Sequence, residues 1–126
     1  MLDKITRFLV VLLVILSNAA YADTQKEIAH LLDFVANTAC KYERNGTLYD
    51  GIEAQAHIKK KYQYFIDKIK SAEDFIKYSA TESTMSGKKY KILCADMPVQ
   101  NSGDWLLEEL KKIRQRRSGG NSRLPG

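Results

Sequence analysis

Hydrophobic residues occur along this chain first as one unbroken run and then as periodic stripes. The unbroken run, Phe8–Leu16, follows a short cationic segment and precedes the small-x-small sequence Ala20-Tyr21-Ala22. These three parts are the pattern of a cleavable secretory signal peptide. The run is also shorter than the roughly 20 apolar residues that cross a bilayer. We therefore expect residues 1–22 to be a signal peptide cleaved after Ala22, and the mature chain to be periplasmic, with no membrane span.

After the leader, apolar residues recur at the three-to-four-residue spacing of amphipathic helices. Cap sequences delimit several of these segments, including a capping box at Thr24–Glu27 and the helix-stopping pair Asn45-Gly46. The helices predicted in this way span residues 25–42, 50–70 and 71–81, and a last helix begins at Ser102 or Asp104. Tyr90–Cys94 is the strand candidate, and it has no clear partner strand. The predicted fold is mainly α, with about four short helices and one extended segment.

The end of the chain differs in composition from the rest. Residues 118–126 are rich in glycine and serine and are predicted to be a flexible basic tail, which leaves one helical domain over residues 23–117. The net charge is +5, of which the leader carries +1. Much of the excess lies near the end of the chain, at Lys111, Lys112, Arg114, Arg116, Arg117 and Arg123. A basic last turn complements the helix dipole, and export removes the usual nucleic-acid partner, so no nucleic-acid binding is expected.

Two cysteines, Cys40 and Cys94, both lie after the leader. An even number of cysteines in an exported chain favours a disulfide. Closing a loop of this length would stabilise the fold by roughly 4 kcal/mol in the chain-entropy model. The alternative is a nucleophilic or metal-binding thiol. Because neither cysteine lies in a recognised reactive motif, we expect a structural Cys40–Cys94 bridge.

Titration of free thiols in denaturant tests this bridge. We expect the purified, unreduced chain to contain no free thiol, because both cysteines are oxidised together in an exported protein. Two free thiols would refute the bridge.

A first polar cluster contains Arg44 and Tyr49 on a loop, followed by Glu53, His57 and Lys61 at helical i, i+4, i+8 spacing. A carboxylate beside an imidazole is a general-base arrangement, because the carboxylate fixes the ring tautomer and favours the charged ring. Glu53 and His57 are therefore the candidate catalytic residues, with Arg44 as an anion clamp. The competing interpretation is a structural hydrogen-bond network that ties the loop to the helix.

Neither a metal nor a cofactor is expected at this first cluster. A metal site needs a third or fourth ligand, and beyond Glu53 and His57 the sequence offers only His30 or scattered carboxylates. The spacing Glu-x-x-x-His also differs from that of the zinc-protease motif.

A second polar cluster, Ser83–Tyr90, combines hydroxyls, a glycine and two lysines. Such a composition is typical of loops that bind anions, so Ser86 and Lys88 join Arg44 and Tyr49 as candidate ligand-binding residues. The segment lacks the glycine spacing of a phosphate-binding loop, and Ser86 is not in a nucleophile-elbow sequence. A turn that ends the third helix and directs Tyr90 into the core explains the same residues.

The two clusters together resemble a known family. The resemblance is carried by Arg44-Asn45-Gly46-Thr47, Tyr49, Glu53-Ala54, His57, Ala72-Glu73-Asp74-Phe75-Ile76, Ser83, Ser86-Gly87-Lys88, Tyr90, Trp105-Leu106 and Leu110. In this order and spacing they are similar to the YfeK-like family of small exported bacterial proteins, a domain of unknown function. Lys59 and Lys89 depart from the pattern, standing where arginine and proline are expected. The resemblance implies a periplasmic helical domain in a Gram-negative bacterium, and it implies no activity.

Two function classes fit these features. The first is a non-enzymatic binding or interaction module in the periplasm, whose partner is a protein or a cell-envelope component. The second is a small hydrolase or ligand-processing enzyme that uses the Glu53/His57 pair with Arg44. The two differ in what they require of His57. Catalysis needs Arg44, Tyr49, Glu53, His57 and Ser86 to converge on a pocket with a perturbed histidine, whereas an architectural site leaves His57 packed among satisfied partners.

Overall fold

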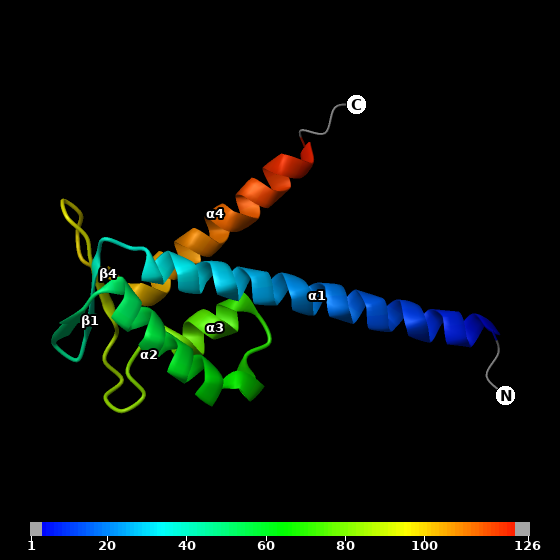
Figure 1. Ribbon diagram of the computed structural model, residues 1–126, viewed down its shortest axis with the longest axis horizontal. Helices are drawn as coiled ribbons and strands as arrows, with labels where there is room; N and C mark the ends of the chain where they lie inside the picture. Colours follow the sequence, from blue (N-terminus) through cyan, green and yellow to red (C-terminus); the bar gives the residue numbers. More distant parts are fainter. Residues whose placement is uncertain (1–3, 123–126) are drawn as a thin grey trace.

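The computed structural model describes residues 4–122, and its helices and a small sheet pack around one core (Figure 1). The helices are α1 (Lys4–Ala36), α2 (Gly51–Tyr64), the 3-10 helix η1 (Ile66–Lys68), α3 (Ala72–Ser79) and α4 (Ser102–Ser122). The strands are β1 (Lys41–Arg44), β2 (Thr47–Tyr49), β3 (Lys91–Leu93) and β4 (Gln100–Asn101). The mainly helical prediction is therefore confirmed, while α1 and α4 are long helices rather than short ones.

The short strands form an antiparallel sheet in the order β2-β1-β3-β4. The prediction of a single extended segment is thus wrong in extent: β3 lies where a strand was expected, but it has partners on both sides. Asn45 and Gly46 do not stop a helix. Their φ angles are +50° and +83°, and left-handed backbone at both central residues is what a tight two-residue hairpin turn requires. They form the turn between β1 and β2.

The predicted Cys40–Cys94 disulfide is present. In the β1–β3 register Lys41 pairs with Leu93 and Tyr42 with Ile92, so the two cysteines lie opposite each other one position beyond the last paired residues. The bridge therefore fastens one end of the central strand pair of the sheet. It connects segments that are 54 residues apart in the sequence.

Several helix boundaries differ from the expected ones. The first helix begins at Lys4, passes through Thr24, where a cap was expected, and ends at Ala36. The second begins at residue 51 with a capping box in which Asp50 and Glu53 each accept a hydrogen bond from the other's backbone N–H. It gives way to η1 after Tyr64. Ser71, which begins the helix predicted over residues 71–81, caps α3 by accepting a 3.0 Å hydrogen bond from the Asp74 backbone N–H.

Gly51, the first residue of α2, is needed where α2 meets the end of α1. A Cβ at this position would lie 2.3 Å from the Val35 carbonyl oxygen and 2.9 Å from that of Ala36. Such distances are far below van der Waals contact, so a larger residue would force the two helices apart. The glycine therefore allows α2 to start directly against α1.

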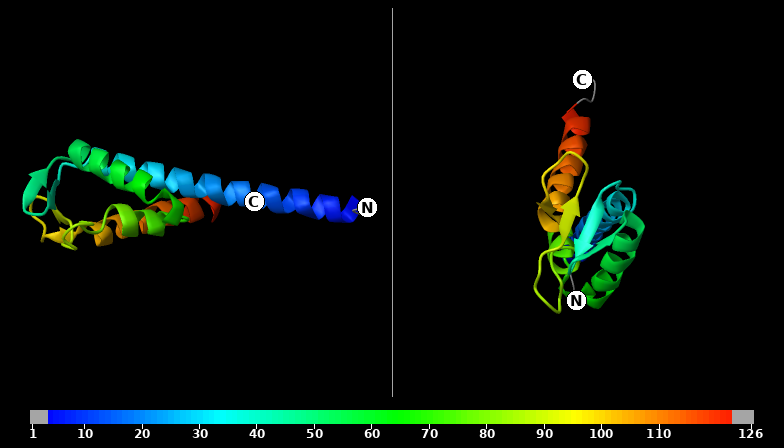
Figure 2. Two further views of the ribbon diagram at one scale, coloured as in Figure 1. Left: turned by 90° about the horizontal axis from the view of Figure 1, so that it is seen from below. Right: turned by 90° about the vertical axis from the view of Figure 1, so that its left-hand side faces the viewer.

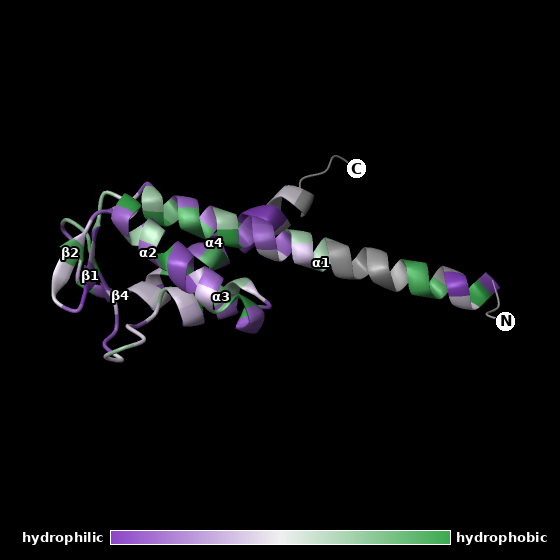
Figure 3. Ribbon diagram, turned by 60° about the horizontal axis from the view of Figure 1, so that its bottom comes forward, coloured by the Kyte–Doolittle hydropathy of each residue, from purple (hydrophilic) through white to green (hydrophobic). Residues whose placement is uncertain are grey.

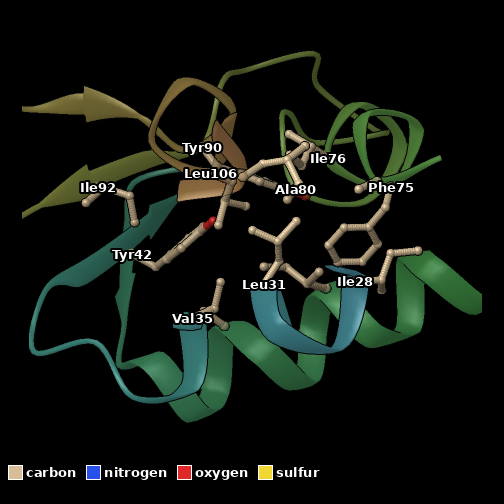
Figure 4. Close-up of a cluster of buried hydrophobic side chains, with 14 of the residues drawn as sticks. Ile28, Leu31, Val35, Tyr42, Phe75, Ile76, Ala80, Tyr90, Ile92 and Leu106 are labelled. Carbon is tan, nitrogen blue, oxygen red and sulfur yellow. The ribbon is translucent and has the colours of Figure 1, made fainter. Parts of the chain in front are cut away.

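The core lies between the helices and one face of the sheet (Figure 4). Helix α1 contributes Ile28, Leu31 and Val35, and α3 contributes Phe75 and Ile76. Buried residues from the sheet side and from the other helices complete the cluster: Tyr42, Ala54, Ile58, Ile69, Ala72, Ala80, Tyr90, Ile92, Leu106 and Leu110. The apolar spacing predicts that Ile28, Leu31, Leu32, Val35 and Ala39 form one stripe of the first helix. Ile28, Leu31 and Val35 are buried and Leu32 packs against the core, whereas Ala39 lies beyond the end of α1.

The first half of α1 projects away from this core (Figures 1 and 2). Ile5, Leu9, Val10 and Val11 expose more than half of their surface, and the described core begins at Ile28. The green, apolar part of this projection lies beyond the packed body in Figure 3. Within the described part of the chain, no helix has the length and apolar character needed to cross a membrane. Helix α4 continues to Ser122 and so includes the beginning of the segment predicted as a tail.

Ion pairs join α4 to α1 and α3. Arg114 binds the Glu27 carboxylate through two hydrogen bonds of 2.9 and 3.0 Å and the Glu73 carboxylate through two more of 3.0 and 2.9 Å. Arg117 adds a 2.8 Å bond to Glu27, whose side chain is only 6% exposed. The hydrogen bonds from Arg114 hold the pKa values of Glu27 and Glu73 below the ordinary 4.5. The buried carboxylate of Glu27 thus depends on its arginine partners.

We predict that Arg114→Met destabilises the fold at neutral pH. The substitution keeps the aliphatic stem but leaves the buried Glu27 carboxylate with one cationic partner instead of two. Breaking a buried pair costs about 3–5 kcal/mol, and because Arg114 is partly exposed we expect a smaller loss, about 1–3 kcal/mol, in the free energy of unfolding. Urea denaturation at pH 7 measures it. Lys112→Met, which removes a charge from an exposed position on the same helix, is the matched control.

The loss should also depend on pH. A carboxylate with a lowered folded-state pKa stabilises the fold above its unfolded-state value of about 4.5, and this contribution disappears as the pH falls through the folded-state pKa. The difference in stability between wild type and Arg114→Met should therefore shrink between pH 5 and pH 3. A difference that stays constant over this range would contradict the assignment.

Candidate functional site

A pocket of about 280 Å³ lies between α2 and the β1–β2 hairpin. Its lining combines tyrosines, cationic groups and small apolar side chains with one carboxylate. The lining residues are Tyr42, Arg44, Tyr49, Glu53, Ala54, Ala56, His57, Ile58, Lys60 and Tyr90. Four of the predicted site residues, Arg44, Tyr49, Glu53 and His57, are therefore brought together.

The hairpin places three of the lining residues on one face of the sheet. Successive side chains of a strand point to opposite faces, so Tyr42 and Arg44 of β1 share a face. Tyr49 of β2 lies directly opposite Tyr42 in the register and joins them. The Arg44 guanidinium carbon lies 5.2 Å from the centroid of the Tyr49 ring, in the range of a cation–π contact. The hairpin thus provides both an aromatic wall and a cation.

Helix α2 forms the opposite wall. Glu53, His57 and Lys60 follow one another at i, i+4 and i+7, so they lie on one face of the helix. The Asp50 cap and the close approach at Gly51 determine where this face begins. The tip of the hairpin and the start of α2 are only a few residues apart in the sequence. This short connection is why the Arg44–His57 cluster could be recognised in the sequence.

Arg44 and His57 contact each other across the pocket. Nη1 of Arg44 contacts the His57 ring and can donate a hydrogen bond to one of its two nitrogens. An arginine can only donate, so the contact requires a ring nitrogen that carries no proton. Burial, followed by the positive charges of Arg44, Lys61 and Lys60, lowers the pKa of His57. His57 is therefore a neutral acceptor at pH 7, not the charged ring that a paired carboxylate would produce.

Glu53 does not act on His57 as the sequence suggested. Its carboxylate Oε1 accepts a 3.2 Å hydrogen bond from the Asp50 backbone N–H and so completes the α2 capping box. Within residues 4–122 no hydrogen bond or ion pair joins Glu53 to His57. The two residues line the same pocket, but the general-base pair is not formed. Glu53 forms the capping interaction instead of pairing with His57, because it occupies the third position after the N-cap residue Asp50.

The other two predicted binding residues, Ser86 and Lys88, lie outside the pocket lining. Ser86 Oγ donates a 2.7 Å hydrogen bond to the Asn45 side chain and accepts one of 3.2 Å from the Lys88 backbone N–H. Ser83 also receives a 3.3 Å bond from Asn45. The 83–88 loop therefore fastens the turn of the β1–β2 hairpin, a role that neither interpretation of this segment predicted.

Among the polar lining residues, Tyr42, Tyr90 and Lys60 were not predicted as site residues from the sequence. Tyr42 and Tyr90 are almost completely buried, and their rings contact each other edge to face at 6.5 Å (Figure 4). The Lys61 ammonium lies 3.3 Å from the Tyr90 hydroxyl and donates a 2.5 Å bond to the Glu82 backbone carbonyl. Interpreting Asn45-Gly46 as a hairpin turn would have placed Tyr42 beside Arg44 by strand alternation.

The chemistry available in this pocket is limited. Its lining contains no serine, threonine, cysteine or aspartate, so it offers no hydroxyl or thiol nucleophile beside His57 other than the phenols. Within the described residues, no group of three or more His, Cys, Asp or Glu side chains is placed to hold a metal ion. What the pocket does offer is an arginine, a lysine, a neutral imidazole and three aromatic rings.

Comparison with known proteins gives one finding. The model of a family described as a family of unknown function (DUF5329) matches residues 22–114, a range that contains every residue of the pocket. No curated protein and no solved structure matches the chain.

We predict that His57 titrates below the value of about 6.5 for a free histidine, because burial and three cations oppose its protonation. NMR titration of the ring protons measures this, with His30→Gln to assign the two histidines. Arg44→Met should move the His57 pKa upward by removing one of the opposing charges. Lys59→Met, on α2 but outside the pocket, should leave it unchanged. A His57 pKa at or above 6.5 in the wild type would show that this electrostatic picture is wrong.

Proposed function

The chain belongs to DUF5329, a family of unknown function, and we propose that it is a non-enzymatic binding module that acts in the periplasm and holds a small molecule in the pocket between α2 and the β1–β2 hairpin. The observation that carries the proposal is Arg44. Arg44 lines the pocket, its Nη2 has a contact of 3.4 Å to the Tyr49 hydroxyl, and no carboxylate pairs with it within the described residues. Guanidinium groups bind carboxylates and phosphates through paired hydrogen bonds, and a ligand is one way to provide the missing partner.

The pocket has the features of a small-molecule site. Ligand sites are concave and mostly apolar, with a few convergent polar groups, and here Tyr42, Tyr49 and Ile58 surround Arg44 and His57. Its volume of about 280 Å³ is just below the usual range of about 300–1,000 Å³. A small cell-envelope component suits this volume better than a segment of a folded protein does.

Binding is favoured over catalysis for two reasons. A general base needs a free acceptor nitrogen within reach of the substrate and, in most sites, a group that orients the ring. Here the ring nitrogens of His57 contact Arg44, and Glu53 caps α2 instead of orienting the ring. The hydrolase alternative would need both residues to change partners when the substrate binds.

The proposed location rests on the leader and on the disulfide. The segment 1–22 has the three parts of a signal peptide, and the described core begins only at Ile28, so removing the leader would leave the core intact. Disulfides such as Cys40–Cys94 persist in oxidising compartments. The resemblance to the YfeK-like exported proteins points to the same compartment.

Native mass spectrometry tests the binding proposal. We expect the full chain, expressed with its leader in a Gram-negative host and purified from the periplasm, to retain a small-molecule adduct after incubation with a periplasmic metabolite extract. Ala56→Leu should lose the adduct, because Ala56 is an exposed helical position that lines the pocket, and leucine fills the pocket without weakening the helix.

Lys59→Met is the control that should keep the adduct, and thermal unfolding should show that both variants are folded. The intact mass of the purified chain also reports whether residues 1–22 have been removed. The binding proposal is wrong if wild type and Ala56→Leu retain the same adducts, or if neither retains one.

A further inference from the structure

The positive charge of Arg44 is not neutralised within the protein. A guanidinium has five N–H donors. In this chain Nη1 contacts the His57 ring, Nη2 lies 3.4 Å from the Tyr49 hydroxyl, and Nε has no partner. Within residues 4–122 no ion pair joins Arg44 to a carboxylate. All its identified partners are neutral groups.

The surroundings of Arg44 add further positive charge. Lys60 lines the pocket, and Lys61 lies just behind it, bound to the Glu82 backbone carbonyl and the Tyr90 hydroxyl. Burial lowers the pKa of Lys61, the nearby Glu82 carboxylate partly offsets this by raising it, and the charge of Arg44 lowers it again. The one carboxylate of the lining, Glu53, is exposed and already accepts a hydrogen bond at the α2 cap. The lining therefore contains two cations, Arg44 and Lys60, and one carboxylate, and no ion pair joins this carboxylate to Arg44 within the described residues. The net charge of the lining is positive.

The walls around this charge are aromatic. Tyr49 lies beneath the Arg44 guanidinium at 5.2 Å, and Tyr42 and Tyr90 form a buried edge-to-face pair. Aromatic rings pack favourably against such walls in offset or edge-to-face arrangements. The volume of the pocket limits the occupant to a small molecule rather than a polymer. The positive charge of Arg44, the aromatic walls and the small volume of the pocket together indicate one class of ligand.

We propose that the pocket binds a small aromatic anion, with its carboxylate or phosphate group on the Arg44 guanidinium and its ring between the tyrosines and α2. This inference rests on the proposed binding function and specifies its ligand class. Arginine suits the role because its planar fork matches the geometry of both carboxylate and phosphate oxygens. The anion supplies the acceptor that the residues around Arg44 lack.

Calorimetric titration with matched probes tests the inference on the full chain. The probes are 2-naphthoate, 2-naphthyl phosphate, the neutral 2-naphthamide and inorganic phosphate. We expect at least one of the two anionic naphthyl probes to bind at least about tenfold more tightly than naphthamide, which is the effect of one charge-assisted hydrogen bond. The stronger of the two identifies whether the natural anion is a carboxylate or a phosphate. Inorganic phosphate should bind weakly, because it lacks the ring.

Variants locate the anion. Arg44→Met should weaken binding of the better anionic probe by about tenfold or more and leave naphthamide unchanged, since only the charged contact is lost. Arg44→Lys keeps the charge without the fork and should give an intermediate affinity. If Arg44→Met does not fold, Arg44→Lys and Ala56→Leu provide the comparison. Lys59→Met removes a nearby positive charge outside the pocket and should change the affinity little.

The outcomes separate this inference from the proposed function. Equal binding of naphthamide and the anionic probes would overturn the anion assignment while leaving a small-molecule pocket. An equal loss of anion affinity in Arg44→Met and Lys59→Met would show a nonspecific charge effect and would also overturn it. If none of the naphthyl probes binds, the aromatic-anion class is wrong, and the metabolite adduct in native mass spectrometry still decides whether the pocket binds another kind of molecule.

Discussion

The pairing of β1 with β3, fastened by the Cys40–Cys94 disulfide, determines where the pocket residues lie. The strands contain four and three residues, and isolated pairs of this length are marginal in water. Cys40 and Cys94 lie opposite each other in the same register, and the bridge between them prevents the two strands from separating at that end. Because side chains alternate along a strand, fixing this register directs Tyr42 and Arg44 together toward α2. A shift by one residue would turn both away from the pocket.

The second constraint is the tight connection between hairpin and helix. The left-handed turn at Asn45 and Gly46 returns β2 along β1, and α2 begins two residues after β2 ends. Gly51 lets α2 start against the end of α1. The Asn45 side chain donates a hydrogen bond to Ser83 and accepts one from Ser86, and these bonds hold the turn from outside. The pocket is therefore supported by backbone geometry on both sides and by lining side chains that belong to the core, Tyr42, Ala54, Ile58 and Tyr90.

The sequence allowed correct predictions where the interacting residues are close in the chain, and it failed where they are far apart. The α3 cap at Ser71, the stripe Ile28, Leu31, Val35 and the clustering of Arg44 with His57 are local and could be predicted. The hairpin was missed because strands of three or four residues show too little alternation to be recognised. Tyr90 joins the pocket through strand pairing and packing, which connect distant parts of the sequence. The partner of Glu53 could not be chosen from spacing alone, since capping and pairing with His57 both suit its position.

The two groups of arginines differ in a way that indicates where function lies. Those of α4 are matched with carboxylates: Arg114 and Arg117 with Glu27, and Arg116 with Glu109. Arg114 and Arg117 are thus accounted for by packing of α4 against α1 and α3, and Arg116 by a pair within α4. The predicted basic last turn is not formed, because α4 continues to Ser122 and its last turn contains no basic residue. Arg44 has no such match, although placing a carboxylate opposite it would stabilise the fold. This difference supports the proposal that the partner of Arg44 is a ligand rather than a side chain of the protein.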